Sequence, residues 1–388
     1  MHCSSSDPVC IVMSGSTAIF PTHEVSILRA TWHLSYFIMS HKTLLAFKKH
    51  HFFALKALML IPIGILLAAC ESTLERTVFD GETMGTTYRI TLTTEEPVSA
   101  GVKTSLATDF DEKLIYINSL MSTYDPLSEI SRLNKLGAGQ CQAISAETQA
   151  VIDHSRILYA KTEGAFDPTV GPLVNLWGFG PERRINNPPD PELVALASQK
   201  TGFHSIKQGC EAGGLLKEKA LEIDFSAIAK GFAVDYLSDW LVEEGYGNHL
   251  VEIGGEIKAL GQAPSGKAWR VAIERPNQLE RQLYQVVQLT NVSMATSGDY
   301  RNFFVADGKR YSHTIDPRTG YPVTHHVASV TVIHPEATMA DGWATALNVM
   351  GRESGMDLAE SEGLAVLMLE YDGDEIVPYA SEAFRALF

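Results

Sequence analysis

The segment Thr338-Met-Ala-Asp341-Gly-Trp-Ala-Thr345 combines one carboxylate with two hydroxyl groups at helical spacing. Asp341 and Thr345 are four residues apart, so on a helix their oxygens project from one face. A carboxylate and a hydroxyl beside backbone carbonyls suit Mg²⁺, which takes few protein ligands and a phosphate partner. The alternative is a capping box, in which Thr338 caps the helix, Asp341 follows three residues later and Thr345 faces solvent.

The segment Tyr311-Ser-His-Thr-Ile-Asp-Pro-Arg-Thr-Gly-Tyr-Pro322 places a histidine close to a carboxylate in a turn that prolines and a glycine define. His313, held in such a turn beside Asp316, is a candidate general base. The alternative is structural: Asp316 caps the turn, and His313 is a hydrogen-bonded core residue.

The segment Leu221-Glu-Ile-Asp-Phe-Ser-Ala-Ile-Ala-Lys-Gly231 is predicted to run from a strand into a helix that begins at Ser226. Helix N-termini attract anions, and Lys230 lies one turn into this helix, where it could meet a phosphate. Asp224 would repel a phosphate, so it needs another partner, such as a base or ring N–H. The glycine pattern is not that of a Walker A loop.

Three short segments place methionine, phenylalanine or tyrosine near glycine or in a loop: Met84-Gly-Thr-Thr-Tyr88, Met121-Ser-Thr-Tyr124 and Gly164-Ala-Phe-Asp-Pro168. Such side chains could enclose a flat ring. The alternative is that they belong to the hydrophobic core. The segment Val251-Glu-Ile-Gly-Gly-Glu256 is interpreted most simply as a tight hairpin turn.

Alternating and helical hydrophobic patterns predict the elements that must position these residues. Helices are expected around 106–121, from Ser145 towards Gly164, at 226–244 and at 336–350. Residues 164–190 are predicted to form a long loop, of the kind that often serves as a lid or a site. Strands are expected at 86–93, before Ile223, and at 250–253, 256–260, 269–274, 283–289, 300–305, 328–333 and 364–371. Consecutive strands without helices between them favour antiparallel pairing and an α+β fold. No domain boundary is evident.

The composition excludes some functions. The chain has 388 residues, of which 31 are Lys or Arg and 46 are Asp or Glu, giving a formal net charge of −15. This charge disfavours nucleic-acid binding, because no local basic patch offsets it. The five cysteines show neither a CxxC nor a Cys/His ligand spacing, so neither a zinc site nor a disulfide framework is indicated. Cys141 and Cys210 remain candidates for pairing in an oxidising compartment.

The stretch from His41 to Cys70 has the order of a secretory signal: basic residues, an apolar run and small residues before a cysteine. The Leu-Ala-Ala-Cys70 sequence resembles a bacterial lipobox, in which this cysteine is lipidated and becomes the new N-terminus. The alternative is a short transmembrane anchor. We expect translation to start at Met39, residues 1–69 to be removed, and residues 70–388 to form the mature domain.

The motifs of the mature chain, in this order, resemble those of the ApbE family of FAD:protein FMN transferases. The resemblance covers about Thr83 to Phe388 and rests on MGTTY, MSTYDPLSEISRLN, GAFDPTVGPLVNLWGFG, DFSAIAKGFAVD, VEIGGE, SHTIDPRTGYP and TMADGWATAL. It implies a single ApbE-like (T-fold-like) catalytic domain with largely antiparallel sheet flanked by helices. It also implies a Mg²⁺-dependent enzyme that splits FAD, transfers FMN to a threonine hydroxyl of a target flavoprotein and releases AMP. Phe225 stands where the family usually has leucine, a change expected to affect packing alone.

The resemblance assigns roles by motif position. His313 occupies the position of the catalytic histidine. The metal would be held by Asp341, Thr345 and the backbone carbonyl of Ala227, with Ala344 adjacent. The FAD contacts implied by the resemblance are Met84, Tyr124, Ala165, Phe166, Asp167, Asp224, Lys230 and Ile315.

The resemblance further implies a protein that is lipid-anchored through Cys70 in the bacterial cell envelope and faces the periplasm. The expected partners are FAD and an exported target, such as a subunit of a membrane redox pump, and nucleic acid is not among them. Two other functions remain open. One is a Mg²⁺-dependent FAD pyrophosphatase that yields FMN and AMP, and the other is a lipoprotein that only binds flavin.

Overall fold

The computed structural model describes residues 74–180, 187–210, 213–276, 282–298 and 302–388. The described residues from Leu74 to Phe388 belong to one compact unit. The signal-like segment, Met39 and Cys70 lie outside the described residues, so the processing of residues 1–69 stays a prediction. Within the described ranges, no helix is long and apolar enough to cross a membrane.

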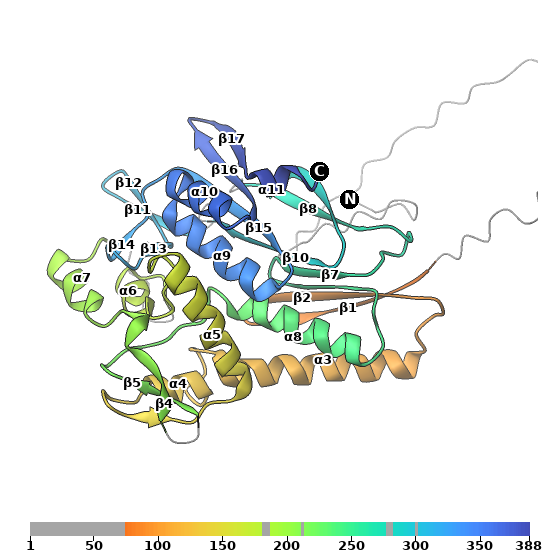
Figure 1. Ribbon diagram of the computed structural model, residues 1–388, viewed down its shortest axis with the longest axis horizontal. Coiled ribbons are helices and arrows are strands. Elements are labelled where there is room, and N and C mark those ends of the chain that lie inside the picture. Colours follow the sequence, from red (N-terminus) through yellow and green to blue (C-terminus); the bar gives the residue numbers. More distant parts are fainter. Residues whose placement is uncertain (1–73, 181–186, 211–212, 277–281, 299–301) are drawn as a thin grey trace, which may run out of the picture. The chain divides into compact units, whose positions relative to one another are not determined.

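An eight-stranded sheet forms the centre of this unit (Figure 1). All neighbouring strands in it pair antiparallel, which confirms the predicted α+β class. In spatial order the strands are β1 (Glu75–Thr83), β2 (Thr86–Thr94), β6 (His249–Ile253), β7 (Glu256–Leu260), β10 (Val292–Gly298), β15 (Val327–His334), β16 (Ala365–Asp372) and β17 (Glu375–Ala380).

Each face of the sheet packs against its own hydrophobic cluster. On β6, Val251 and Ile253 point into a cluster shared with the helices, whereas Leu250 points into a second cluster on the opposite face. The helical side is covered by α3 (Ala100–Met121), α5 (Ala146–Lys161), α8 (Ala229–Glu243), α9 (Ala337–Met350) and α10 (Arg352–Ser361). The other side is covered by the hairpin of β8 (Trp269–Arg275) and β9 (Gln282–Leu289) and by α11 (Glu382–Arg385). The strand at 86–93, predicted to be half-buried, is therefore buried on both faces at its centre.

Several predictions differ from the observed elements. The strand predicted to end at Ile223 is wrong, because residues 218–225 form neither strand nor helix and the preceding strand, β5, ends at Lys217. The helix expected from Ser226 begins at Ala229, because the Asp224 carboxylate accepts a hydrogen bond from the backbone N–H of Ser226 and holds a turn there. The expected loop at 164–190 contains the short helix α6 (Gly171–Leu176). Residues 292–298, for which no strand was predicted, form β10 in the middle of the sheet.

The remaining elements are small and lie around the sheet. They are α4 (Glu129–Asn134), α7 (Pro191–Ser198), the 3₁₀ turn Phe203–Ser205, and the hairpins of β11 (Phe303–Ala306) with β12 (Lys309–Ser312) and of β13 (Ile315–Asp316) with β14 (Tyr321–Pro322). A three-stranded sheet has the order β3 (Cys141–Gln142), β5 (Gly214–Lys217) and β4 (Ile206–Cys210).

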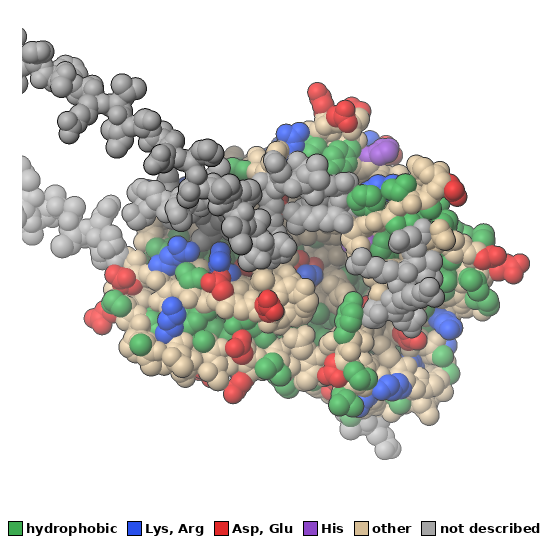
Figure 2. Space-filling model, turned by 180° about the vertical axis from the view of Figure 1, so that it is seen from behind, with side chains coloured by type: hydrophobic (Ala, Val, Ile, Leu, Met, Phe, Trp, Pro, Cys, Tyr) green, Lys and Arg blue, Asp and Glu red, His purple; other side chains and the backbone are tan. Residues whose placement is uncertain are grey.

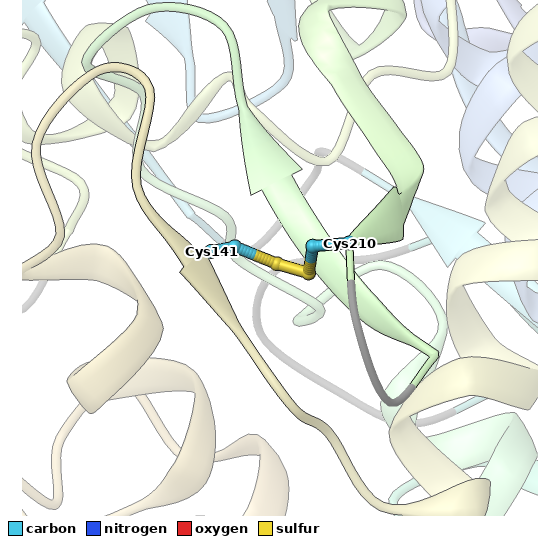
Figure 3. The surroundings of a disulfide bond; sticks show 2 residues. All are labelled: Cys141 and Cys210. Carbon is cyan, nitrogen blue, oxygen red and sulfur yellow. A yellow bond between two sulfur atoms is a disulfide. The ribbon is translucent and has the colours of Figure 1, made fainter.

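Cys141 and Cys210 form a disulfide bond within the small sheet (Figure 3). Their Cα atoms are 6.3 Å apart, inside the range that a disulfide spans. Cys141 lies on β3 and Cys210 on β4, and both strands pair with β5. The bond therefore joins the two outer strands of this sheet, and the pairing left open by the sequence occurs.

Charges of both signs are mixed on the surface. On the face in Figure 2, Lys and Arg side chains stand among Asp and Glu side chains, and the described residues of this face form no continuous basic patch. The chain as a whole is acidic, with a net charge of −15. An anion therefore needs a local positive group wherever it binds.

Candidate active site

Helices α8 and α9 cross closely, and a side chain of each caps the other. Asp235 of α8 accepts hydrogen bonds from the backbone N–H groups of Ala337 (2.9 Å) and Thr338 (2.8 Å) at the start of α9. Asp341 of α9 accepts one from the N–H of Gly231 (3.0 Å) in the first turn of α8. A Cβ atom at position 231 would lie 2.3 Å from the carbonyl oxygen of Ala337, so the crossing requires glycine. The two carboxylates satisfy N–H groups that helix starts leave unpaired.

The alternative interpretation of this motif, a capping box, is wrong. The N-cap residue of α9 is Glu336, and its side chain makes no capping bond. The hydroxyl of Thr338 donates to Asp235 at 2.7 Å, and Asp341 faces the start of α8. A carboxylate from a neighbouring helix therefore replaces the local cap that the sequence suggested.

The bond between Asp341 and Gly231 leaves one backbone carbonyl without a backbone donor among the described residues. In a regular helix, the N–H of Gly231 would donate to the carbonyl four residues earlier, which is that of Ala227. Asp341 takes this N–H instead, and no backbone N–H of the described residues donates to the Ala227 carbonyl. The carbonyl oxygen predicted to be a metal ligand is therefore available at the start of α8.

Lys230 reaches between two carboxylates. Its Nζ atom is 3.6 Å from Oε1 of Glu256 on β7 and 3.8 Å from Oδ2 of Asp341. Burial alone lowers the pKa of Lys230, but the carboxylates of Asp341 and Glu256 raise it by more, so the net pKa lies above its usual value. The lysine is therefore charged, and it supplies the local positive group that an anion needs.

Glu256 is almost completely buried, at 4% exposure. Its Oε2 atom has no hydrogen-bond partner among the described residues. Burial and the nearby Asp341 raise the pKa of Glu256, the Lys230 ammonium lowers it, and the net pKa lies above its usual value. A buried carboxylate oxygen without a partner is costly, so it indicates a site that a ligand or a bound water completes.

The described residues contain no group of three or more His, Cys, Asp or Glu side chains arranged to hold a metal ion. The α8–α9 crossing offers a different set: the Asp341 carboxylate, the Thr345 hydroxyl and the Ala227 carbonyl. Between 337 and 349, Thr345 is the one residue of α9 that is not buried, and its hydroxyl has no hydrogen-bond partner among the described residues. Few hard-oxygen ligands with room for water or phosphate fit Mg²⁺. Ala344 is buried beside them and offers only its backbone.

His313 lies just before β13, in a turn near the C-terminal half of α9. Its Nδ1 atom is 3.0 Å from the carbonyl oxygen of Asn302, and the Phe179 ring contacts it edge-on. Thr314, the next residue, lies 3.5 Å from the side chain of Asn348 on α9. The Asp316 carboxylate accepts the guanidinium N–H groups of the neighbouring Arg318 at 2.9 Å. These contacts hold the turn in place. The Asp316 carboxylate bonds to Arg318 within the turn, as the structural alternative predicted.

The segment from Gly164 to Pro168 approaches the start of α8 through its backbone. The carbonyl of Pro168 accepts a hydrogen bond from the N–H of Asp224 at 2.7 Å. Ala165 and Phe166 are buried, so their side chains do not face solvent at the site. The Asp167 carboxylate accepts bonds from Thr169 and from the N–H of Phe203. Burial raises the pKa of Asp167, and these bonds lower it.

This arrangement accompanies a family signature. Residues 84–368 match the model of the ApbE family. The chain belongs to the ApbE family. It is 44% identical over 322 residues to a Vibrio cholerae protein named FAD:protein FMN transferase, covering 83% of this chain and 95% of that one. It is 39% identical over 340 residues to the Haemophilus influenzae protein of the same name, covering 86% and 97%.

Solved ApbE structures show the same fold. The flavin transferase ApbE from Vibrio cholerae superimposes with a TM-score of 0.74 at 41% identity, covering 81% of this chain and all of that one. The apo form of the flavinyl transferase ApbE from Pseudomonas stutzeri superimposes with a TM-score of 0.75 at 39% identity, covering 81% and 97%. These likenesses confirm the family and the fold predicted from the motifs.

The remaining residues expected to contact FAD in this ApbE chain differ in how they are placed relative to the α8–α9 crossing. Met84 sits in the β1–β2 turn with a positive φ of 49° and packs against the helical core. Ile315 is buried on β13, which packs against α9. Tyr124 is 72% exposed, and no hydrogen bond of its side chain to the crossing is present among the described residues. Its predicted role is the one that this arrangement supports least.

Sequence reasoning did not single out two charged residues of β7. Glu256 and Lys258 alternate along the strand, so both face the helices, where hydrophobic side chains would be expected. Glu256 pairs with Lys230, and Lys258 pairs with Asp235 at 3.0 Å. The sequence signal that could have revealed them is the pair of charged residues at alternate positions of an otherwise apolar strand.

Proposed function

We propose that this chain is an FAD:protein FMN transferase, which moves FMN from FAD to a threonine hydroxyl of a target flavoprotein and releases AMP. The named relatives support the reaction. The structural observation that carries the proposal is the α8–α9 crossing. There, a charged lysine, a free backbone carbonyl, a hydroxyl and a carboxylate share one small region of an otherwise acidic protein.

We assign the metal position to Asp341, Thr345 and the Ala227 carbonyl. The Ala227 carbonyl and the Thr345 hydroxyl, neither of which has a hydrogen-bond partner within the described ranges, support this assignment. Bound Mg²⁺ would supply neutralisation of charge on the non-bridging phosphate oxygens, which is most of what phosphoryl-transfer catalysis requires.

The protein groups have separate tasks in the proposed reaction. Lys230 and the N-terminus of α8 bind the pyrophosphate of FAD through positive charge. The threonine oxygen of the target attacks the phosphorus on the FMN side, and a new P–O bond forms. His313 accepts the threonine proton. The bond from this phosphorus to the bridging oxygen breaks, and AMP leaves with that oxygen and its electron pair.

We propose that the mature enzyme is exported and lipid-anchored at Cys70 on the periplasmic side of the cell envelope, where its target is a redox-pump subunit or a similar exported flavoprotein. The Cys141–Cys210 bond supports export, because structural disulfides persist mainly in oxidising compartments. Replacing Cys70 by serine should move the protein from the membrane fraction to the soluble fraction. Continued membrane association of that variant would contradict the lipid anchor.

The reaction is tested by incubating the purified protein with FAD and MgCl₂, with and without an apo redox-pump subunit that has an acceptor threonine. We expect AMP to be released only when the subunit is present. The mass of the subunit should rise by the mass of one attached FMN group. Free FMN and AMP without covalent flavin would indicate a pyrophosphatase instead. Intact FAD after prolonged incubation would indicate a flavin-binding protein without this chemistry.

A further inference from the structure

Two lysine–carboxylate pairs join β7 and α8 in different ways. Lys258 donates a hydrogen bond to Asp235 at 3.0 Å and another to the carbonyl of Pro335 at 2.8 Å. Lys230 stands 3.6 Å from Glu256 and 3.8 Å from Asp341, beyond the usual 2.7–3.0 Å of a charged hydrogen bond. The first pair is a short, fully formed ion pair. The ammonium of Lys230 makes only longer contacts with the carboxylates of the described residues, so its N–H groups can turn to a third partner.

The position of Lys230 depends on attraction from two sides. Asp341 approaches from α9, and Glu256 approaches from β7, directly after the β6–β7 turn. The turn packs against the lysine stem, since a Cβ atom at Gly254 would lie 3.3 Å from Cδ of Lys230. Glu252 fixes the turn by accepting the N–H of Gly255 at 2.8 Å. The backbone that carries Glu256 is therefore held in place, although no group of the described residues donates a hydrogen bond to its Oε2 atom.

We propose that Glu256 is a positioning residue for FAD binding: it draws the ammonium of Lys230 away from Asp341 and holds it, with free donors, where the pyrophosphate of FAD arrives. This inference rests on the proposed function, because it assumes that FAD is the ligand of this site. Glu256 acts through Lys230 and needs no contact with FAD.

Replacing Glu256 by a side chain that cannot carry a negative charge has a definite consequence. With glutamine at position 256, Asp341 is the carboxylate of the described residues that still attracts Lys230, and the ammonium can move onto it to form a hydrogen-bonded pair. The donors are then used within the protein, as they are at Lys258. Lys230 would be less available to the pyrophosphate, and Asp341 would be partly neutralised.

The Glu256→Gln variant separates this positioning role from simple charge repulsion, because the two predict opposite changes in FAD affinity. FAD affinity is measured by flavin fluorescence in EDTA, without a target protein, so that neither metal nor turnover contributes. If Glu256 positions Lys230, the variant should bind FAD roughly tenfold more weakly, within the range of coupling between residues in contact. If Glu256 merely repels the anionic ligand, the variant should bind FAD more tightly. Unchanged or tighter binding would overturn the proposal.

A double-mutant cycle with Lys230→Met tests whether Glu256 acts through the lysine. In the Lys230→Met background, the Glu256→Gln change should no longer weaken FAD binding. Equal weakening in both backgrounds would show that Glu256 acts independently of Lys230 and would also overturn the proposal. Thermal unfolding of each variant confirms that it is folded.

Glu129→Gln is the matched control. Glu129 is also a buried glutamate, but both of its oxygens accept bonds from Ser145, and it lies on α4. This variant should lose stability without losing FAD affinity.

Failure of this inference can be told apart from failure of the proposed function. A wild-type protein that binds FAD but transfers no FMN would contradict the function and leave the role of Glu256 measurable. A wild-type protein that does not bind FAD would contradict both.

Discussion

At the scale of single residues, Asp341 links three parts of the site through one carboxylate. It faces the ammonium of Lys230 and accepts the N–H of Gly231, and the latter bond leaves the carbonyl of Ala227 without a backbone donor in the described part of the chain. A change at Asp341 therefore acts on helix capping and on charge together. A variant that keeps an acceptor oxygen separates the two effects.

Asp341→Asn should keep the protein folded, because the amide oxygen can still accept the N–H of Gly231. It removes the negative charge assigned to the metal, so we expect Mg²⁺-dependent turnover to fall by at least about 100-fold. Steady-state AMP release against MgCl₂ concentration measures the change, and far-ultraviolet circular dichroism checks the fold. Full activity at ordinary MgCl₂ concentrations would remove Asp341 from the metal assignment.

His313→Ala should bind FAD with nearly unchanged affinity, because the binding charge comes from Lys230. Transfer of FMN should fall by about 10²–10⁴-fold, the usual contribution of a general base. Single-turnover transfer and FAD fluorescence, measured on the same preparation, separate the two effects. Normal transfer by this variant would mean that another group, such as an aspartate, accepts the threonine proton.

Sequence reasoning proposed residues of the candidate site when their motif was local, and missed residues whose role a distant element sets. Asp341 and Thr345 share one helix turn, so their spacing suggested them as metal ligands, and that assignment stays a prediction. The capping role of Thr338 was misjudged, because its partner Asp235 lies 103 residues away. Glu256 was missed because its proposed role depends on the side chain of Lys230, which is distant in sequence and close only in the folded chain.

At the scale of elements, the crossing of α8 and α9 depends on the Asp235 carboxylate. It accepts two N–H groups and a hydroxyl at the start of α9 and pairs with Lys258, which is 9% exposed. Asp235→Ala should lower the free energy of unfolding by about 3 kcal/mol, because a buried lysine and a helix start lose their partner. Urea denaturation measures this loss.

Asp239→Ala is the control for that measurement. Asp239 lies one turn further along α8 on its exposed side, so its replacement should change the free energy of unfolding by less than about 0.5 kcal/mol. Equal losses from the two variants would contradict the capping role of Asp235.

The elements themselves were predicted best where periodic patterns and caps agree. Ser145 caps α5 as predicted, and the hydrophobic stripe before Met121 lies in α3. The strand β10 was missed because Val292–Gly298 is rich in small and polar residues, and neighbouring strands rather than side-chain alternation fix it in the sheet. The short helix α6 was missed among prolines and glycines, since six residues carry little periodic signal.

At the scale of the whole molecule, the disulfide joins strands that are distant in sequence. Cys141 and Cys210 are separated by 69 residues, so the bond restricts the unfolded chain over a long loop. Replacing both by serine should lower the free energy of unfolding by about 2–4 kcal/mol. Urea denaturation with and without dithiothreitol measures it. The reductant should destabilise the wild type and leave the double variant unchanged. Equal stability of the wild type and the double variant without dithiothreitol would contradict a structural role.

The central claim is that the α8–α9 crossing binds the pyrophosphate of FAD. A crystal structure of the protein with FAD and MgCl₂ tests this most directly. We expect the pyrophosphate next to the Lys230 ammonium and a cation held by Asp341, Thr345 and the carbonyl of Ala227. A flavin nucleotide bound elsewhere, with the crossing free of both phosphate and cation, would contradict the account.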